Sequence, residues 1–467
     1  ENEFAPAPLA IVDESFADVG VDSLATMRRP AIVLKSFGKF WGLAGVRLGF
    51  AICDPDHAEA LRQALSGCDA VLHTAGLFSN RLEDQALMER TNVDGTRSVL
   101  TLASELGLDP MEVRLKNCSK TGTKANFGIK WDQIGLEETL IAAKEHPHWT
   151  APLGPNQGRG LSCGFWFNHG GETSVSLALS PDGTVALSVG TPDIGGSRAS
   201  MCLMAAEELG VPYEKIRTTV VDTASLGYND VSHGSRVTYA SGLATIKAAR
   251  DAKKKLCARA AKIWGIDEDA VTWEDGMAKP SGHNAGDHDP LPFAKLCKLM
   301  GRTGGPISGH FEATPEGAGV SFATHVVDAE VDPETGAAKV VRYTIVQDAG
   351  KAIHPAYVEG QFQGGAAQGI GWALNEEYVD GEDGRLQNAG FLDYRIPVAS
   401  DLPFMDTIIV EVPNPGHPYG VRGVGETSIC PPLAAIANAV SNAAGVRMTE
   451  LPMSPPRLLA ALDGKDA

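Results

Sequence analysis

The sequence predicts an α+β fold made of two β-hairpin–helix halves, preceded by short α/β fragments at the N-terminus. Three observations lead to this expectation. Alternating apolar residues flank a turn at 181–183 and another at 332–336, which is typical of β-hairpins. Each hairpin is followed by a loop, a helix and a further strand, so the two segments share one order of elements. Before residue 50, two apolar runs with intervening loops predict the N-terminal fragments.

The first half is expected to begin with strands at 158–179 and 184–191, where apolar and polar residues alternate. A helix over 201–210 follows, and Gly210 marks its end because glycine adopts the left-handed conformation of a helix cap. Residues 241–264 are rich in Ala and Lys, which predicts a solvent-facing amphipathic helix.

The second half is expected to contain strands at 322–331 and 337–347, followed by a glycine-rich helix at 356–374. Two helices, at 110–117 and around 136–146, precede both halves. These elements place the chemistry-bearing motifs on loops and helix ends.

Composition limits the classes of function. The chain has 467 residues, 43% hydrophobic and 21% charged, which is typical of a soluble globular protein with two to four domains. A net charge of −18 argues against nucleic acid or an anionic membrane as partner, and no apolar run is long enough to span a bilayer. Eight dispersed cysteines without a CxxC pair argue against zinc ribbons and iron–sulfur clusters and favour a cytoplasmic protein. The chain begins without Met, so we expect its natural N-terminus to lie upstream.

Residues 1–65 contain IVDESF at 11–16 and VLKSFGKFWGLAGVRLGF at 33–50. This pattern resembles the fold-type I pyridoxal-phosphate aminotransferases, especially the threonine-phosphate decarboxylase branch. The resemblance implies Lys39 as Schiff-base lysine, Asp13 facing the pyridinium nitrogen, and Ser36 and Arg47 on the phosphate. An amine, an anion and phosphate donors are what that cofactor requires.

Residues 66–106 read GCDAVLHTAGLF and later ERTNVDGTRSVLTLASELG. A strand, a small-residue turn and a helix bearing Asn92 resemble the extended short-chain dehydrogenase/epimerase family. Neither the phosphate loop nor the YxxxK pair of that family occurs in the chain, and forty residues of a Rossmann fold cannot hold a dinucleotide. The aminotransferase fragment also lacks most of its cofactor site, so a structural role is favoured for both.

The remaining 107–467 contain several separate motifs: GLDPMEVRLKN, VEGQFQGGAAQGIGWALNEE, NAGFLDYRIPVASDLP and GVRGVGETSICPPLAAIANAV. In this order they resemble the molybdopterin-binding large subunit of the xanthine dehydrogenase / molybdenum hydroxylase family. The resemblance implies that 107–157 are the tail of a first molybdopterin-binding domain and 158–467 a second one. The joints fall on short strings common to both parents, which indicates a chimera formed by recombination or misassembly rather than linked domains.

Glu426 is the expected catalytic residue. It follows Gly423 and Gly425 in a Gly-Val-Gly-Glu turn, where the glycines let the backbone pass close to a bulky ligand. A carboxylate at the tip of such a turn is placed to take a proton from that ligand. The alternative is a helix N-terminal carboxylate stabilised by the helix dipole. The family resemblance favours the first interpretation and implies that Glu426 is the base of an oxidative hydroxylation.

Four positions of the helix at 356–374 are assigned to the cofactor. Gln361 and Gln368 are seven residues apart and therefore lie on one face. Glycines weaken an isolated helix, so Gly364 and Gly365 are expected where another group packs very close. The alternative explanation of the glycines is tight helix–helix packing.

Two loops are further candidates. Gly195, Gly196, Ser197 and Arg198 precede a helix N-terminus, which is an anion-binding arrangement, and the resemblance implies that this loop faces the metal. Most relatives have glutamine where this chain has Gly195. The second loop holds two residues that either contact phosphate or cap the next helix, Ser235 and Arg236.

The resulting hypothesis is a truncated molybdenum hydroxylase large subunit that oxidises an aldehyde or N-heterocycle and passes electrons to iron–sulfur and FAD subunits. Its cofactor is molybdopterin, expected in the cytosine dinucleotide form. Because only the tail of the first domain is expected in the chain, the chain by itself is expected to be inactive. Two alternatives stay open: a pyridoxal-phosphate (PLP) enzyme using Lys39, and a chimeric fragment that makes only packing interactions.

Overall fold

The computed structural model describes three short strands near the N-terminus and residues 107–125, 129–315 and 319–464. It divides into two compact units, Glu1–Trp131 and Asp132–Ala467. The predicted domain boundaries at 65, 106 and 157 are not tested by this division and stay predictions.

The described residues of the first unit form a three-stranded sheet and one helix. Strand β1 (Ala10–Asp13) pairs in parallel with β2 (Ala31–Ser36), which pairs antiparallel with β3 (Gly49–Ile52). Helix α4 (Pro110–Asn117) begins where the carboxylate of Asp109 accepts hydrogen bonds from the backbone N–H groups of two first-turn residues. This cap satisfies two donors that have no partner within the helix.

One four-stranded sheet of the second unit follows the order β11-β5-β6-β7. Strands β5 (Thr173–Leu179) and β6 (Val185–Val189) form a hairpin, and helix α7 (Ser197–Leu209) returns the chain to β7 (Ile216–Val220), parallel to β6. Strand β11 (Ser308–Ala313) pairs with β5.

Helix α9 (Gly242–Trp264) is part of the core of this sheet. Its alanines at 244, 248 and 252 are fully buried with apolar residues of β5, β6 and α7. The prediction of a solvent-facing helix therefore describes only its lysine-rich face. Helix α10 (Phe293–Thr303) and a small three-stranded sheet complete the region. The order of this sheet is β10 (Leu291–Pro292), β9 (Met277–Pro280) and β8 (Val271–Glu274).

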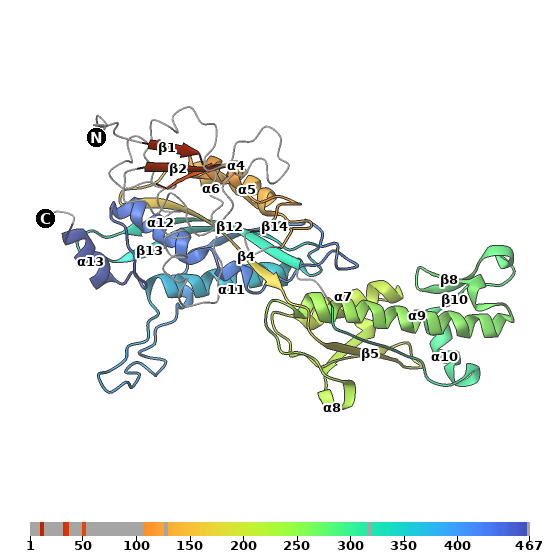
Figure 1. The fold of residues 1–467 in the computed structure, drawn as a ribbon. Coiled ribbons are helices and arrows are strands. Elements are labelled where there is room, and N and C mark those ends of the chain that lie inside the picture. The colour runs from red at the N-terminus through yellow and green to blue at the C-terminus, as the bar shows by residue number, and fades with distance from the viewer. Residues whose placement is uncertain are drawn as a thin grey trace, which may run out of the picture. The chain divides into compact units, whose positions relative to one another are not determined.

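The other four-stranded sheet follows the order β14-β13-β12-β4. A hairpin of β12 (Gly319–Val331) and β13 (Ala338–Asp348) is followed by helix α11 (Pro355–Leu374) and the parallel strand β14 (Met405–Val410). Strand β4 (Gln157–Asn168) pairs with the other edge of β12 (Figure 1).

Helices cover both faces of this second sheet. Apolar side chains of β12, β13, α11 and α12 (Pro432–Ala444) form one buried cluster. On the other face of β12, Thr324 contacts Thr139 of α5 (Leu136–Glu145) through their hydroxyl groups at 3.0 Å. The remaining elements are short or terminal: α6 Pro147–Thr150, α8 Thr223–Leu226, α13 Pro455–Asp463, the π-turn Val237–Ser241 and the 3-10 turns Tyr213–Lys215, Glu268–Ala270, Gly282–Asn284, Ala399–Asp401 and Thr427–Ile429.

The strand predicted over 158–179 is two strands in two different sheets. Strand β4 ends at Asn168, β5 begins at Thr173, and the four residues between them form a connection. Apolar alternation continues on both sides of this connection, so the pattern does not reveal the break. Among the helices that the structure describes, none has the length and apolar character needed to cross a bilayer.

Candidate functional site

The Gly423–Glu426 turn connects the edge of the second sheet to α12. The side chain of Asn168, at the end of β4, donates from Nδ2 to the carbonyl oxygen of Gly423 at 2.9 Å. Its Oδ1 accepts from the Gly423 N–H at 3.0 Å. Asn168 is fully buried, so these two bonds fix the turn on the strand.

Arg422 anchors the turn from the other side. Its guanidinium lies 3.0 Å from the Asp348 carboxylate, and both side chains are almost completely buried, at 1% and 0% exposure. It also donates to the carbonyl oxygens of Val320, Val412 and Gln133. Burial raises the pKa of Asp348 to about 6, although the charge of Arg422 acts against this rise. This buried pair holds the start of the turn in one position.

Ser235 holds the Glu426 side chain directly. Its Oγ donates to Glu426 Oε2 at 3.0 Å and accepts from the Glu426 backbone N–H at 3.0 Å. Ser235 has a φ of 53°, the left-handed region that non-glycine residues seldom adopt. A methyl group at Gly423 would overlap the Ser235 carbonyl oxygen, so the two backbones are in direct contact. Oε1 of Glu426 makes no hydrogen bond with any residue that the structure describes.

The loop before α7 lies against α11. A methyl group at Gly195 would come within 2.6 Å of Gln361 Cδ, and one at Gly196 within 2.6 Å of Tyr357 Cε2. Both glycines have positive φ angles, 62° and 74°, so the chain can approach the helix this closely only because neither has a side chain. A methyl group at Gly425 would lie 3.6 Å from Gln361 Oε1. The amide of Gln361 therefore lies between this loop and the turn that bears Glu426.

Two polar side-chain atoms in the first turn of α7 are buried without a partner. Ser197 Oγ and Arg198 Nε have no hydrogen-bond partner among the described residues. The backbone N–H of Arg198 is already used, because it donates to Asp193 Oδ1 at 3.0 Å. Unpaired buried polar groups are unfavourable, so a ligand that satisfied these two atoms would be favoured.

The glycines of α11 have two different explanations. Gly365 packs against the Ser428 side chain, and Ser428 Oγ donates to the Gln361 carbonyl oxygen at 3.1 Å. A methyl group at Gly364, in contrast, would meet no described atom within 4 Å. Gln368 is exposed. Packing therefore explains Gly365, whereas Gly364 and Gln368 present an open face of the helix.

The structure places Arg236 in a structural role. Its side chain is 0% exposed and donates to the carbonyl oxygens of Gly170, Glu172 and Asp230. A guanidinium used in this way has few donors left for a phosphate. The sequence left two interpretations of Arg236 open, a phosphate ligand and a helix cap. Its hydrogen bonds to backbone carbonyl oxygens do not support the phosphate interpretation.

Comparisons with known proteins follow the same division of the chain. The sequence profile described as molybdopterin cofactor-binding domain matches residues 142–403, more than half of the chain. The chain belongs to the molybdopterin cofactor-binding domain family. The match ends before the turn with Glu426, so the role of Glu426 stays a prediction.

Curated relatives of this molybdopterin-binding chain include two oxidoreductases. The xanthine dehydrogenase molybdenum-binding subunit of Escherichia coli O157:H7 is 30% identical over 380 residues, covering 76% of this chain and 50% of that protein. The aldehyde oxidoreductase of Megalodesulfovibrio gigas is 30% identical over 383 residues, covering 77% and 39%. The chain spans about half the length of the xanthine dehydrogenase subunits it matches.

A solved structure with a similar fold is quinoline 2-oxidoreductase from Pseudomonas putida 86. It has a TM-score of 0.71 at 23% identity and covers 78% of this chain and 50% of that chain. At this identity the likeness concerns the fold alone.

The N-terminal part of the molybdopterin-binding chain matches a different profile. Aminotransferase class I and II covers residues 7–104, which supports the aminotransferase resemblance. The match extends over most of the segment expected to resemble an epimerase, so that second resemblance stays a prediction. Asp13 and Ser36 are the last residues of the parallel strands β1 and β2. Lys39 and Arg47 lie outside the described residues.

Sequence reasoning missed two contributors to this site. Asn168 and Tyr357 are separated from the residues they support by long stretches of chain, and neither is part of a recognisable motif. One signal could have found Asn168. The polar and glycine-rich string Asn168-His169-Gly170-Gly171 follows an apolar run and indicates that the strand ends there in a polar loop.

Proposed function

We propose that the chain is the molybdopterin-binding part of a molybdenum hydroxylase large subunit, with Glu426 as the base. The single observation that carries this proposal is the fixed carboxylate of Glu426 beside Gln361 and the Gly195–Gly196 loop. The relatives named above are oxidoreductases that bind molybdenum or oxidise aldehydes, which supports an aldehyde or N-heterocycle as substrate class.

The residues present fit a pterin cofactor. The side-chain amide of Gln361 supplies both a donor and an acceptor, which suits the edge of a heterocycle. Ser197 Oγ and Arg198 Nε are buried donors without described partners in the first turn of α7, where a diphosphate would satisfy them. Gly364 and Gln368 offer an open helix face, and Gly423 and Gly425 allow close approach. When bound, the cofactor supplies the metal that accepts electrons from the substrate.

The protein's own contribution to the reaction is to position one proton acceptor. The Ser235 hydroxyl donates a hydrogen bond to Oε2 of Glu426, so Oε1 is the oxygen that would receive a proton from the oxygen nucleophile. Because Ser235 also accepts the Glu426 N–H, the carboxylate and its backbone are held by one hydroxyl group. This arrangement reduces the rotamer freedom that would otherwise be lost on reaction.

Further parts of the proposal concern the whole protein. The electrons are expected to pass to iron–sulfur and FAD subunits, and the cofactor is expected in the cytosine dinucleotide form. Gene neighbourhood and co-purification of such subunits with the chain would test the first expectation.

The test of the base is Glu426→Gln in a large subunit that includes a complete first molybdopterin-binding domain and is assembled with its partner subunits, because the chain by itself is expected to be inactive. Turnover of an aldehyde or N-heterocycle should fall about 10²–10⁴-fold, the range of general-base contributions, while the molybdenum content stays that of the wild type. Glu330→Gln is the control, because it changes an exposed carboxylate that accepts a hydrogen bond from Gln157. Full activity of the Glu426 variant would refute its role, and absence of molybdenum from the wild type would refute cofactor binding.

The profile match over 7–104 keeps the pyridoxal-phosphate alternative as a second candidate. Purified protein would then show an internal-aldimine absorbance that borohydride removes and that Lys39→Ala abolishes. A wild-type spectrum without that band would eliminate this candidate.

A further inference from the structure

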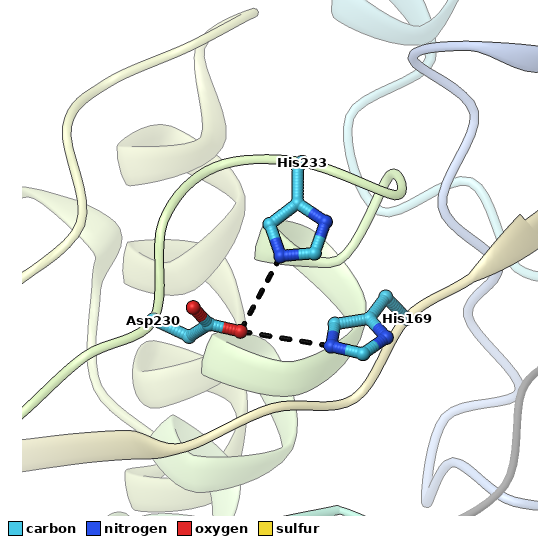
Figure 2. Close-up of side chains that lie close together, drawn as sticks. All are labelled: His169, Asp230 and His233. Carbon is cyan, nitrogen blue, oxygen red and sulfur yellow. Dashed lines mark ion pairs between the residues drawn. The ribbon is translucent and has the colours of Figure 1, made fainter.

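A second group of chemically reactive side chains lies where β4 gives way to β5. His169 follows β4, and Asp230 and His233 belong to the loop before the π-turn. Both imidazoles direct Nε2 toward the same carboxylate oxygen, Oδ2 of Asp230 (Figure 2). Among the described residues this is the one group of three or more His, Cys, Asp or Glu side chains with metal-binding proximity, all ligand atoms lying within 4.8 Å.

The distances within the group are compatible with a metal site. Asp230 Oδ2 lies 3.4 Å from His233 Nε2 and 3.6 Å from His169 Nε2. Charge-assisted hydrogen bonds are shorter, about 2.7–2.9 Å. Ligand atoms at about 2.0–2.2 Å from a tetrahedral zinc ion are roughly 3.3–3.6 Å apart, which agrees with these two separations.

The carboxylate is prepared to act as a ligand. Asp230 Oδ1 accepts the Val231 N–H at 2.8 Å, so Oδ2 is the oxygen that faces the two histidines. The histidine rings lie 4.7 Å apart.

The backbone around the group is rigidly supported. Arg236 joins the Gly170 and Glu172 carbonyl oxygens to that of Asp230, so one buried side chain connects both segments that carry ligands. The His169 N–H donates to the Gly234 carbonyl oxygen at 2.8 Å. Metal sites depend on such outer contacts to hold their ligands in place. The buried Arg236 has no role in the proposed function, but its hydrogen bonds hold the two segments that carry the proposed metal ligands.

We propose that His169, Asp230 and His233 bind one divalent transition-metal ion, zinc by preference, with water completing the coordination. Two imidazoles and one carboxylate favour zinc, nickel or copper over magnesium and calcium, which prefer oxygen ligands alone. The side chains of His169 and His233 are half exposed, at 51% and 47%, so the ion can enter from solvent. The site would pin the end of β4 to the loop that carries Ser235.

The experiment uses the untagged full chain, stripped of metal, and Zn²⁺ in competition with a colorimetric chelator. Wild-type protein should bind one Zn²⁺ per chain at this site, and Co²⁺ should give the visible absorption of a tetrahedral nitrogen–oxygen complex. His169→Ala, His233→Ala and Asp230→Asn should each weaken Zn²⁺ binding by more than the roughly 10–100-fold that loss of an outer contact costs.

His310→Ala is the matched control. His310 is similarly exposed, at 45%, and its Nε2 lies 3.1 Å from Glu312 Oε1, but no third ligand among the described residues is near enough to form a group of three. The His310→Ala variant should bind Zn²⁺ with the same affinity as the wild type. Circular dichroism of each variant verifies the fold. Equal Zn²⁺ affinity of wild type and His169→Ala/His233→Ala double variant, or equal weakening in the control, would overturn the proposal. None of these outcomes depends on molybdenum content or turnover.

Discussion

Replacing Gly423 by alanine tests the contact that positions the Glu426 turn. The added Cβ would overlap the Ser235 carbonyl oxygen and lie 2.8 Å from its carbonyl carbon and 2.9 Å from its Cβ. Carbon atoms in favourable contact are about 3.5–4.0 Å apart, so the carbon contacts alone require the two backbones to separate by roughly 0.7 Å. The overlap with the carbonyl oxygen is the closest contact and requires a larger movement. Overpacking of this kind costs about 1–3 kcal/mol, and the upper part of the range applies because a backbone carbonyl cannot rotate away.

Gly425→Ala is the matched control in the same turn. Its Cβ would lie 3.6 Å from Gln361 Oε1 and 3.8 Å from Ser235 Oγ, which are ordinary contacts. Neither glycine has a positive φ, so backbone strain does not distinguish the two positions. A gain of up to about 0.4–1 kcal/mol is expected at 425, because alanine reduces the entropy of the unfolded chain.

Urea denaturation of the full chain, followed by tryptophan fluorescence, measures both variants against the wild type. The midpoint should fall for Gly423→Ala and stay or rise for Gly425→Ala. Equal midpoints for the two variants would refute the steric argument. Cofactor content adds a second readout, because the methyl group at 425 points toward Gln361 and should reduce molybdopterin binding without lowering stability.

Two further predictions concern buried charge. Arg422→Met leaves the buried Asp348 without its partner and should lower the free energy of unfolding by about 3–5 kcal/mol. Arg342→Met is the control, because it removes only a partly exposed ion pair, 4.0 Å from Asp406, and should lower that free energy by about 0–1 kcal/mol. Similar urea midpoints for the two variants would contradict this prediction. Acidification should destabilise the protein, because burial lowers the pKa of His325 to about 3 and of His417 to about 4, so the unfolded chain takes up protons below pH 6.5 that the folded chain does not. At about pH 5.5 each histidine costs about 1.4 kcal/mol, and the raised pKa of Asp348 offsets about 0.8 kcal/mol, leaving a net loss of about 2 kcal/mol relative to about pH 8. Urea titrations at the two pH values check this, and a free energy of unfolding that does not change would disprove it.

Local chemistry explains which elements the sequence predicts well. The turn at 332–336 is closed by Asp332, whose carboxylate accepts from the Glu334 N–H and the Thr335 hydroxyl, and the hairpin lies where it was expected. The end of α7 at Gly210 has the left-handed conformation that the glycine predicted. Such signals lie within a few residues of the structure they specify.

The site depends on contacts that local patterns do not contain. Ser235 and Glu426 are 191 residues apart, and the sequence alone suggested Ser235 only as a phosphate ligand or a helix cap. Arg236 is similar, because a surface anion site and a buried clamp for backbone carbonyls require the same guanidinium. The connection at 169–172 was missed because apolar alternation is present on both sides of it. The two histidines beside Asp230 come from segments that only the folded chain brings together.

The bare backbone of α11 has an energetic consequence. At Gly360 and Gly364 no described atom lies within 4 Å of where a Cβ would be, although each glycine weakens a helix by about 1 kcal/mol relative to alanine. No described residue packs against these two glycines to offset that free energy. A ligand or another protein surface that shields these peptide groups from water would strengthen their hydrogen bonds, so occupancy of this face and rigidity of the helix are thermodynamically linked.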